Sequence, residues 1–136
     1  MNSHQARLLI VDDLADNRTL LSRYFAGRGF HTVQAESGAA ALVLIDQERF
    51  DAVLLDILMP GMDGIEVLKR VRKSRSKTNL PIIMVSGKTA KMDIALALDL
   101  GANDYITKPI DLAAAVVRVQ DHLTPLVAEQ VIARSA

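Results

Sequence analysis

Residues 52–64 read Ala-Val-Leu-Leu-Asp-Ile-Leu-Met-Pro-Gly-Met-Asp-Gly, an apolar run that leads into an acid and then a turn. The apolar residues are continuous and do not alternate with polar ones, which is typical of a strand buried on both faces of a parallel sheet. Pro60-Gly61 and Asp63-Gly64 are turn dipeptides. The segment therefore predicts a buried strand that presents Asp56 at the edge of a sheet.

Similar apolar runs recur along the chain, and stretches with helical spacing of apolar residues separate them. The expected strands are Leu8–Val11, Thr32–Ala35, Ala52–Leu55, Ile82–Val85 and Tyr105–Ile106. The expected helices are Asp16–Gly27, Gly38–Glu48, Ile65–Arg75, Lys91–Leu100 and Leu112–Leu123. Strands that alternate with helices in this way predict an α/β fold with right-handed crossovers, a flavodoxin-like (βα)5 doubly wound parallel sheet of strand order 2-1-3-4-5.

The last residues differ from this repeating pattern. Thr124-Pro125 is a typical helix start, and the apolar spacing after it predicts a short extra C-terminal helix. We therefore expect one domain in residues 1–123 and a helical extension or linker in residues 124–136. Three roles stay open for the extension: packing on the domain, pairing with another chain, or connection to a further domain.

The composition limits the class of protein. Half of the 136 residues are apolar and 24% are charged, which excludes an intrinsically disordered chain. Basic and acidic residues each number 16, so the net charge is zero and no direct contact with nucleic acid is expected. The lack of cysteine excludes disulfides and thiolate chemistry. No apolar run reaches the about 18 residues of a membrane span, and no secretory segment is recognisable, so we expect a cytoplasmic protein without membrane contact.

Polar residues with complementary chemistry follow four of the expected strands. They are Asp12, Asp13, Asp56, Ser86 and Lys108. Because parallel strands present their carboxyl ends at one edge of the sheet, we expect these side chains to converge there. Three neighbouring carboxylates repel one another and favour a hard divalent cation, for which Mg²⁺ with its preference for oxygen ligands is the natural candidate. A lysine beside such a cation would bind a phosphoryl group, and Asp56 is the candidate nucleophile.

These residues also carry a family resemblance. The segments concerned are Ile10–Asp13, Leu55–Gly64, Val85–Gly87 and Tyr105–Pro109. In their order and spacing they resemble the motifs of response-regulator receiver domains, the phospho-acceptor modules of two-component signalling. The resemblance extends over about residues 7–123, nearly the whole chain.

The resemblance implies a role for each motif residue. Asp56 would accept a phosphoryl group from the phosphohistidine of a sensor histidine kinase or phosphotransfer protein. Asp13, Asp56 and the backbone carbonyl of Leu58 would ligate Mg²⁺, with Asp12 acting through a bound water. Lys108 would contact the phosphoryl oxygens, while Ser86 and Tyr105 would switch position on phosphorylation. The chain would then be a signalling domain, with self-catalysed phosphoryl transfer and autodephosphorylation as its only chemistry. The bond between Lys108 and Pro109 is typically cis in this family.

Several alternatives stay open beside this interpretation. Asp12 and Asp13 could cap a helix, and Tyr105 could be a packing residue. An Asp-nucleophile phosphatase of the haloacid-dehalogenase type would carry a second acid two residues after the nucleophile, where this chain has Leu58. A receiver-fold interaction module excised from a larger regulator, and never phosphorylated, would not require the intact acids and Lys108.

Two expected surface regions also have a predicted character. The expected helices at 91–100 and 112–123 carry more apolar residues than a solvated pair needs, so we expect a partner or homodimer face there, together with strand 105–106. A tightly packed helix pair is the alternative. The basic residues of 70–77 are interpreted as a solvated helix end whose cations suit the helix dipole.

Overall fold

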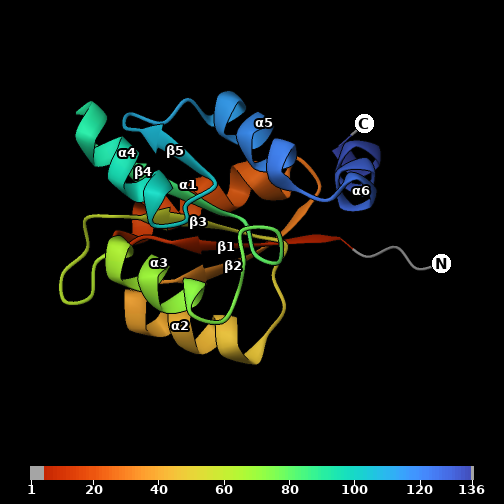
Figure 1. Ribbon diagram of the computed structural model, residues 1–136. Helices are drawn as coiled ribbons and strands as arrows, with labels where there is room; N and C mark the ends of the chain where they lie inside the picture. The colour runs from red at the N-terminus through yellow and green to blue at the C-terminus, as the bar shows by residue number, and fades with distance from the viewer. Residues whose placement is uncertain (1–4, 136) are drawn as a thin grey trace.

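The computed structural model describes residues 5–135 and has a single parallel sheet at its centre (Figure 1). The strands are β1 (Ala6–Val11), β2 (Phe30–Ala35), β3 (Ala52–Asp56), β4 (Ile82–Ser86) and β5 (Asp104–Thr107). Their order in the sheet is β2-β1-β3-β4-β5, and all neighbours pair in parallel. This confirms the predicted fold and strand order. It also places β1, which Asp12 and Asp13 follow directly, beside β3, which ends at Asp56.

Within the described residues, six helices accompany the sheet. They are α1 (Ala15–Ala26), α2 (Gly38–Gln47), α3 (Gly64–Arg72), α4 (Lys91–Asp99), α5 (Leu112–His122) and α6 (Pro125–Ser135). Buried residues of α2, α3 and α4 share one apolar cluster with one face of the sheet, and those of α1, α5 and α6 share a second cluster with the other face. The sheet is thus covered on both faces, as its continuous apolar strands require.

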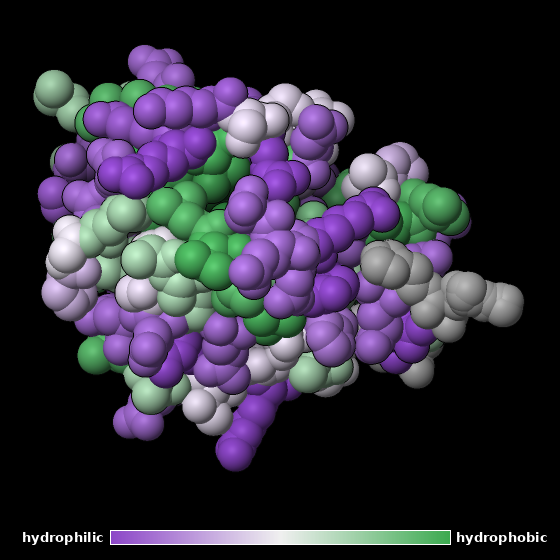
Figure 2. All heavy atoms as spheres, turned by 90° about the horizontal axis from the view of Figure 1, so that it is seen from below, coloured by the Kyte–Doolittle hydropathy of each residue, from purple (hydrophilic) through white to green (hydrophobic). Residues whose placement is uncertain are grey.

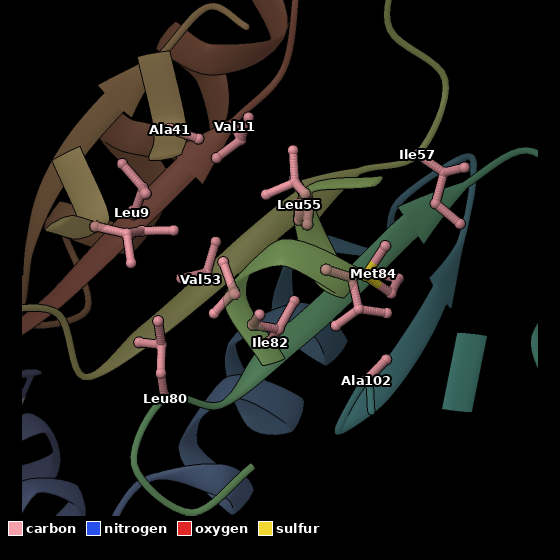
Figure 3. Packing of buried hydrophobic residues seen from close by; sticks show 14 of the residues in the cluster. Leu9, Val11, Ala41, Val53, Leu55, Ile57, Leu80, Ile82, Met84 and Ala102 are labelled. Carbon is pink, nitrogen blue, oxygen red and sulfur yellow. The ribbon is translucent and has the colours of Figure 1, made fainter. Parts of the chain in front are cut away.

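Alternate residues of each strand supply the two clusters. Figure 3 shows the first of them, in which Leu9 and Val11 of β1 lie beside Val53 and Leu55 of β3. The residues between them, such as Ile10 of β1 and Leu54 of β3, belong to the second cluster on the other face of the sheet. Figure 2 views the molecule from the side of α2 and α3, where hydrophilic side chains surround a smaller apolar area.

Local contacts fix the turn that follows β3. The Asp63 side chain caps α3 by accepting a hydrogen bond from the Glu66 amide at 2.9 Å. Gly64 begins the helix at a point where a β-carbon would collide with the main-chain oxygen of Asp56. Only glycine permits this close approach, which holds the start of α3 directly beneath the end of β3.

The helix α3 ends at Arg72, three residues before the predicted end at Arg75. The reason lies in the Arg72 guanidinium, which donates to the main-chain oxygens of Arg75, Ser76, Leu80 and Gly101 and to Oδ1 of Asn103. These acceptors turn the chain back toward β4 and stop the helix. The interpretation of this arginine as part of a solvated helix end is therefore wrong, and burial lowers the pKa of its guanidinium.

The C-terminal helix α6 lies against β1 and α5 (Figure 1). Val127 and Val131, one helical turn apart, are buried in the second apolar cluster, whereas Leu126 and Ile132 are exposed. The extension thus packs on the rest of the chain. No helix within residues 5–135 has the length and apolar character needed to cross a lipid bilayer.

Candidate functional site

The carboxyl ends of β1 and β3 bring three acids together. Val11 pairs with Leu55 across the two strands, so Asp12 and Asp56 are neighbours at the sheet edge. One carboxylate oxygen from each of Asp12, Asp13 and Asp56 lies within 4.8 Å of the other two. Asp12 and Asp56 are each only 3% exposed, while Asp13 is half-buried. The structure therefore brings the three acids together, as the sequence predicted.

Lys108 supplies the positive charge at this edge. Its Nζ lies 3.2 Å from Oδ2 of Asp56, and the Leu58 amide donates to Oδ1 of the same carboxylate at 3.3 Å. Burial raises the pKa of the Asp56 carboxyl, the Lys108 ammonium lowers it, and the charge of Asp12 raises it, with a net upward shift. Burial and the neighbouring acid therefore disfavour the charged form of Asp56, and a further cation at this edge would favour it.

The strands β4 and β5 position the remaining polar groups. The main-chain oxygen of Ser86, at the end of β4, accepts a hydrogen bond of 2.9 Å from the Lys108 amide and so fixes the start of the lysine loop. The peptide bond between Lys108 and Pro109 is cis. Ser86 is fully buried, and its Oγ accepts from the Lys88 amide at 3.1 Å.

Tyr105 is buried against the first apolar cluster, and its hydroxyl donates to the main-chain oxygen of Lys88 at 2.9 Å. Residue 88 is therefore tied to both predicted switch residues, through its amide to Ser86 and through its carbonyl to Tyr105. The Leu58 side chain is 54% exposed in the turn after β3. All seven residues singled out in the sequence thus lie at or beside one edge of the sheet.

Sequence reasoning missed two residues that contact this group. Asn17 Nδ2 lies 3.3 Å from Oδ2 of Asp12, and Arg18 Nη1 donates to the Asp12 main-chain oxygen at 2.7 Å. Both belong to the first turns of α1, which follows the acid pair directly. The signal in the sequence was the presence of two polar residues within about one and a half helical turns of the acid pair, close enough to contact it.

A mostly apolar cavity of about 320 Å³ opens beside the acids. It is lined by Asp12, Asn17, Leu20, Leu21, Lys108, Pro109, Ile110 and Leu112. A larger cavity of about 510 Å³ involves Arg49, Arg75 and Thr124 and lies at the opposite end of the sheet. The smaller cavity therefore shares its walls with the acid group, and the larger one does not.

The donor set suits a hard divalent cation. Three carboxylates within 4.8 Å of one another offer oxygen ligands only, as Mg²⁺ prefers, and their mutual repulsion favours a cation among them. The chain offers no cysteine to favour a softer metal. The residues present thus fit Mg²⁺.

The comparisons with known proteins agree with this geometry. The family model for the response regulator receiver domain matches residues 8–120. The chain is 39% identical over 123 residues to the DNA-binding response regulator MtrA of Mycobacterium tuberculosis, which is 90% of this chain and 53% of MtrA. The chain therefore belongs to the response regulator receiver domain family, and it is a signalling domain of two-component systems.

Solved structures show the same fold. The receiver domain of the Francisella response regulator 1452 is 29% identical with a TM-score of 0.81, over 92% of this chain and 98% of that one. The chemotaxis protein CheY4 of Vibrio cholerae is 30% identical with a TM-score of 0.82, over 88% of this chain and all of that one. The chain spans about half the length of the curated relatives it matches.

Proposed function

We propose that Asp56 accepts a phosphoryl group from the phosphohistidine of a sensor histidine kinase or phosphotransfer protein. A carboxylate oxygen of Asp56 forms the new bond to phosphorus while the bond from phosphorus to the imidazole nitrogen breaks, and the imidazole leaves with the bonding electron pair. The observation that carries this proposal is a buried carboxylate that contacts Lys108 at 3.2 Å and lies within 4.8 Å of two further acids.

Mg²⁺ would be held by Asp13, Asp56 and the carbonyl of Leu58, with Asp12 reaching it through a water. When bound, this ion would offset the charge of the acids and of the phosphoryl oxygens. Lys108 contributes the protein's own cation at the same edge, and the hydrogen bond from its amide to Ser86 O keeps that loop in place. A dianionic group can then approach an acidic pocket that would otherwise repel it.

Ser86 and Tyr105 act as the switch in this proposal. The Ser86 Oγ accepts from the Lys88 amide, so its own hydroxyl proton is available for a phosphoryl oxygen on Asp56. A shift of Ser86 would disturb residue 88, whose carbonyl holds the Tyr105 hydroxyl. Driving a two-state equilibrium from 1:99 to 99:1 takes about 5.5 kcal/mol, which two or three charge-assisted hydrogen bonds of roughly 1.5–3 kcal/mol each can supply.

The phosphoryl donor would approach over α1. Leu14 and Leu20 are each 56% exposed there, and Leu20 also lines the apolar cavity beside Asp12 and Lys108. An apolar surface next to a polar site suits a protein partner better than a small hydrophilic donor. This proposal places the partner's imidazole above the acids and its own apolar side chains on α1.

The output face would consist of α4, β5 and α5. Leu96 of α4 and Val117 of α5 are each 54% exposed, and Met92 is 85% exposed. We propose that phosphorylation changes this face and that it also supports a homodimer. Residues 1–123 would be the receiver unit and residues 124–136 a helical extension. The domain would be a phospho-acceptor with autodephosphorylation, not an enzyme that turns over an external substrate.

Incubation of the chain with Mg²⁺ and acetyl phosphate tests this function. Intact mass spectrometry is expected to show one added phosphoryl group in the wild type and none in Asp56→Asn. The exposed Asp46→Asn, on α2, serves as a control and should be labelled like the wild type. An unmodified wild type would contradict the proposal and favour a receiver-fold module that is never phosphorylated. An Asp56→Asn variant labelled as fast as the wild type would also contradict it, because the acceptor would then be another residue.

A further inference from the structure

Asp12 is held in place by more hydrogen bonds than the neighbouring Asp13. Its amide donates to the Ala35 oxygen at 3.2 Å, and its main-chain oxygen accepts from Arg18 at 2.7 Å. Its carboxylate accepts from the Leu14 amide at 2.9 Å on Oδ1 and from Asn17 Nδ2 at 3.3 Å on Oδ2. Asp13 makes no side-chain hydrogen bond within residues 5–135.

We infer that Asn17 is a positioning residue that keeps the Asp12 carboxylate directed at the acid group before a cation arrives, an inference that rests on the proposed function. Without a bound cation, Asp12 is repelled by Asp13 and Asp56 and would rotate outward if only one of its oxygens were held. One donor on each oxygen fixes the rotation of the carboxylate plane. The lone pairs that the donors do not use still face the other acids.

The sequence around α1 explains why an amide is placed at this position. The helix begins at Ala15 without a side-chain cap, because Leu14 stands at the capping position and its amide is bonded to Asp12. Asn17 lies in the first helical turn, where side chains lean toward the helix N-terminus and hence toward the acid pair. An acidic residue would suit the helix dipole at this point but would add a fourth carboxylate to the group. An asparagine instead supplies a hydrogen-bond donor without any charge.

Asn17 also lines the apolar cavity, beside Asp12. It lines that cavity together with Leu20 and Leu21, so its side chain has a polar contact on one side and apolar neighbours on the other. Replacement by leucine is nearly isosteric, changes no charge and suits the apolar neighbours. The variant Asn17→Leu therefore removes the hydrogen-bond donor while leaving a side chain that the site can accommodate.

The test is the affinity for Mg²⁺, measured by isothermal titration calorimetry, with the melting temperature recorded with and without the ion. In Asn17→Leu we expect the Kd for Mg²⁺ to rise by about tenfold, the lower end of the range for residues behind a metal ligand, because Asp12 reaches the ion through a water. The melting temperature without Mg²⁺ is expected to equal or exceed that of the wild type, and the shift caused by Mg²⁺ is expected to shrink. Asn79→Leu, an exposed asparagine at the opposite end of the sheet, is the matched control and should bind like the wild type.

Two results separate this inference from the proposed function. If the wild type binds Mg²⁺, Asp13→Asn abolishes binding and Asn17→Leu binds with unchanged Kd, then the positioning role is refuted while the function stands. If Asn17→Leu lowers the melting temperature but keeps the full Mg²⁺-induced shift, the residue is structural only, and the inference also fails. A wild type that does not bind Mg²⁺ would overturn both the inference and the metal site of the proposed function.

Discussion

Asp56→Asn should make the chain more stable at neutral pH in the absence of divalent cations. At an effective dielectric constant of about 20, unit charges 4.8 Å apart repel by about 3.5 kcal/mol. The contact between Asp56 and Lys108 at 3.2 Å attracts by about 5 kcal/mol on the same scale. Two repulsions against one attraction leave the Asp56 charge unfavourable by about 2 kcal/mol, and burial adds to this penalty.

The pH dependence follows from the direction of the pKa shift. Because the pKa of Asp56 is raised on folding, the folded chain retains this proton more strongly than the unfolded chain does. The stability of the wild type contributed by this group is therefore present below the ordinary carboxyl pKa of 3.8 and is lost as the pH rises through the raised value. The Asp56→Asn variant lacks this loss, so the two unfolding free energies should diverge as the pH rises.

Thermal and urea unfolding measure the difference. For a chain of this size, about 2 kcal/mol corresponds to a rise in melting temperature of about 6 °C. Saturating Mg²⁺, at about one hundred times its Kd, should return about 2.7 kcal/mol to the wild type and little to the variant. The control Asp46→Asn should behave like the wild type in both conditions. An Asp56→Asn variant that is no more stable without cations, or that Mg²⁺ stabilises as much as the wild type, would contradict a destabilising charge on Asp56 that Mg²⁺ offsets.

Three further substitutions test separate parts of the account. Lys108→Met removes the cation beside Asp56 and should slow labelling by acetyl phosphate about 100-fold. Intact mass recorded against reaction time measures this rate, and an unchanged rate would exclude a role for the ammonium. Val117→Glu places a charge on the proposed dimer face and should weaken self-association in sedimentation, whereas unaltered association would place the interface elsewhere. Arg72→Met removes the donor of five hydrogen bonds and should cost about 3 kcal/mol in urea unfolding, against about 0.5 kcal/mol for Arg70→Met. Equal losses would mean that the half-buried Arg72 guanidinium contributes no more than an exposed ion pair.

The fold was predictable because its local signals agree. The continuous apolar strands, the helical spacing between them and the turn dipeptides after Asp56 all indicate the same alternation of strands and helices, and the structure has each expected element. Convergence of the acids followed from topology alone, since parallel strands end at one edge. These features depend on residues close together in sequence or on a general rule of chain connection.

The features that escaped prediction depend on contacts between distant segments. In the sequence, Arg72 cannot be told apart from the solvated cations next to it. Its half-buried, hydrogen-bonded position depends on Gly101 and Asn103, which approach from beyond β4. Packing of α6 on the domain was one of three roles left open, because the surface between β1 and α5 that receives the helix is revealed by no helical pattern. Asn17 became recognisable as a partner of Asp12 only when the start of α1 was placed against the acid pair.

Tandem mass spectrometry of the chain after reaction with acetyl phosphate and Mg²⁺ tests the central claim most directly. The account predicts a hydroxylamine-labile acyl phosphate on the peptide that contains Asp56, and its disappearance when Mg²⁺ is removed by a chelator. A modification on another residue, a hydroxylamine-stable phosphate on Ser86, or labelling that persists without the divalent ion would contradict it.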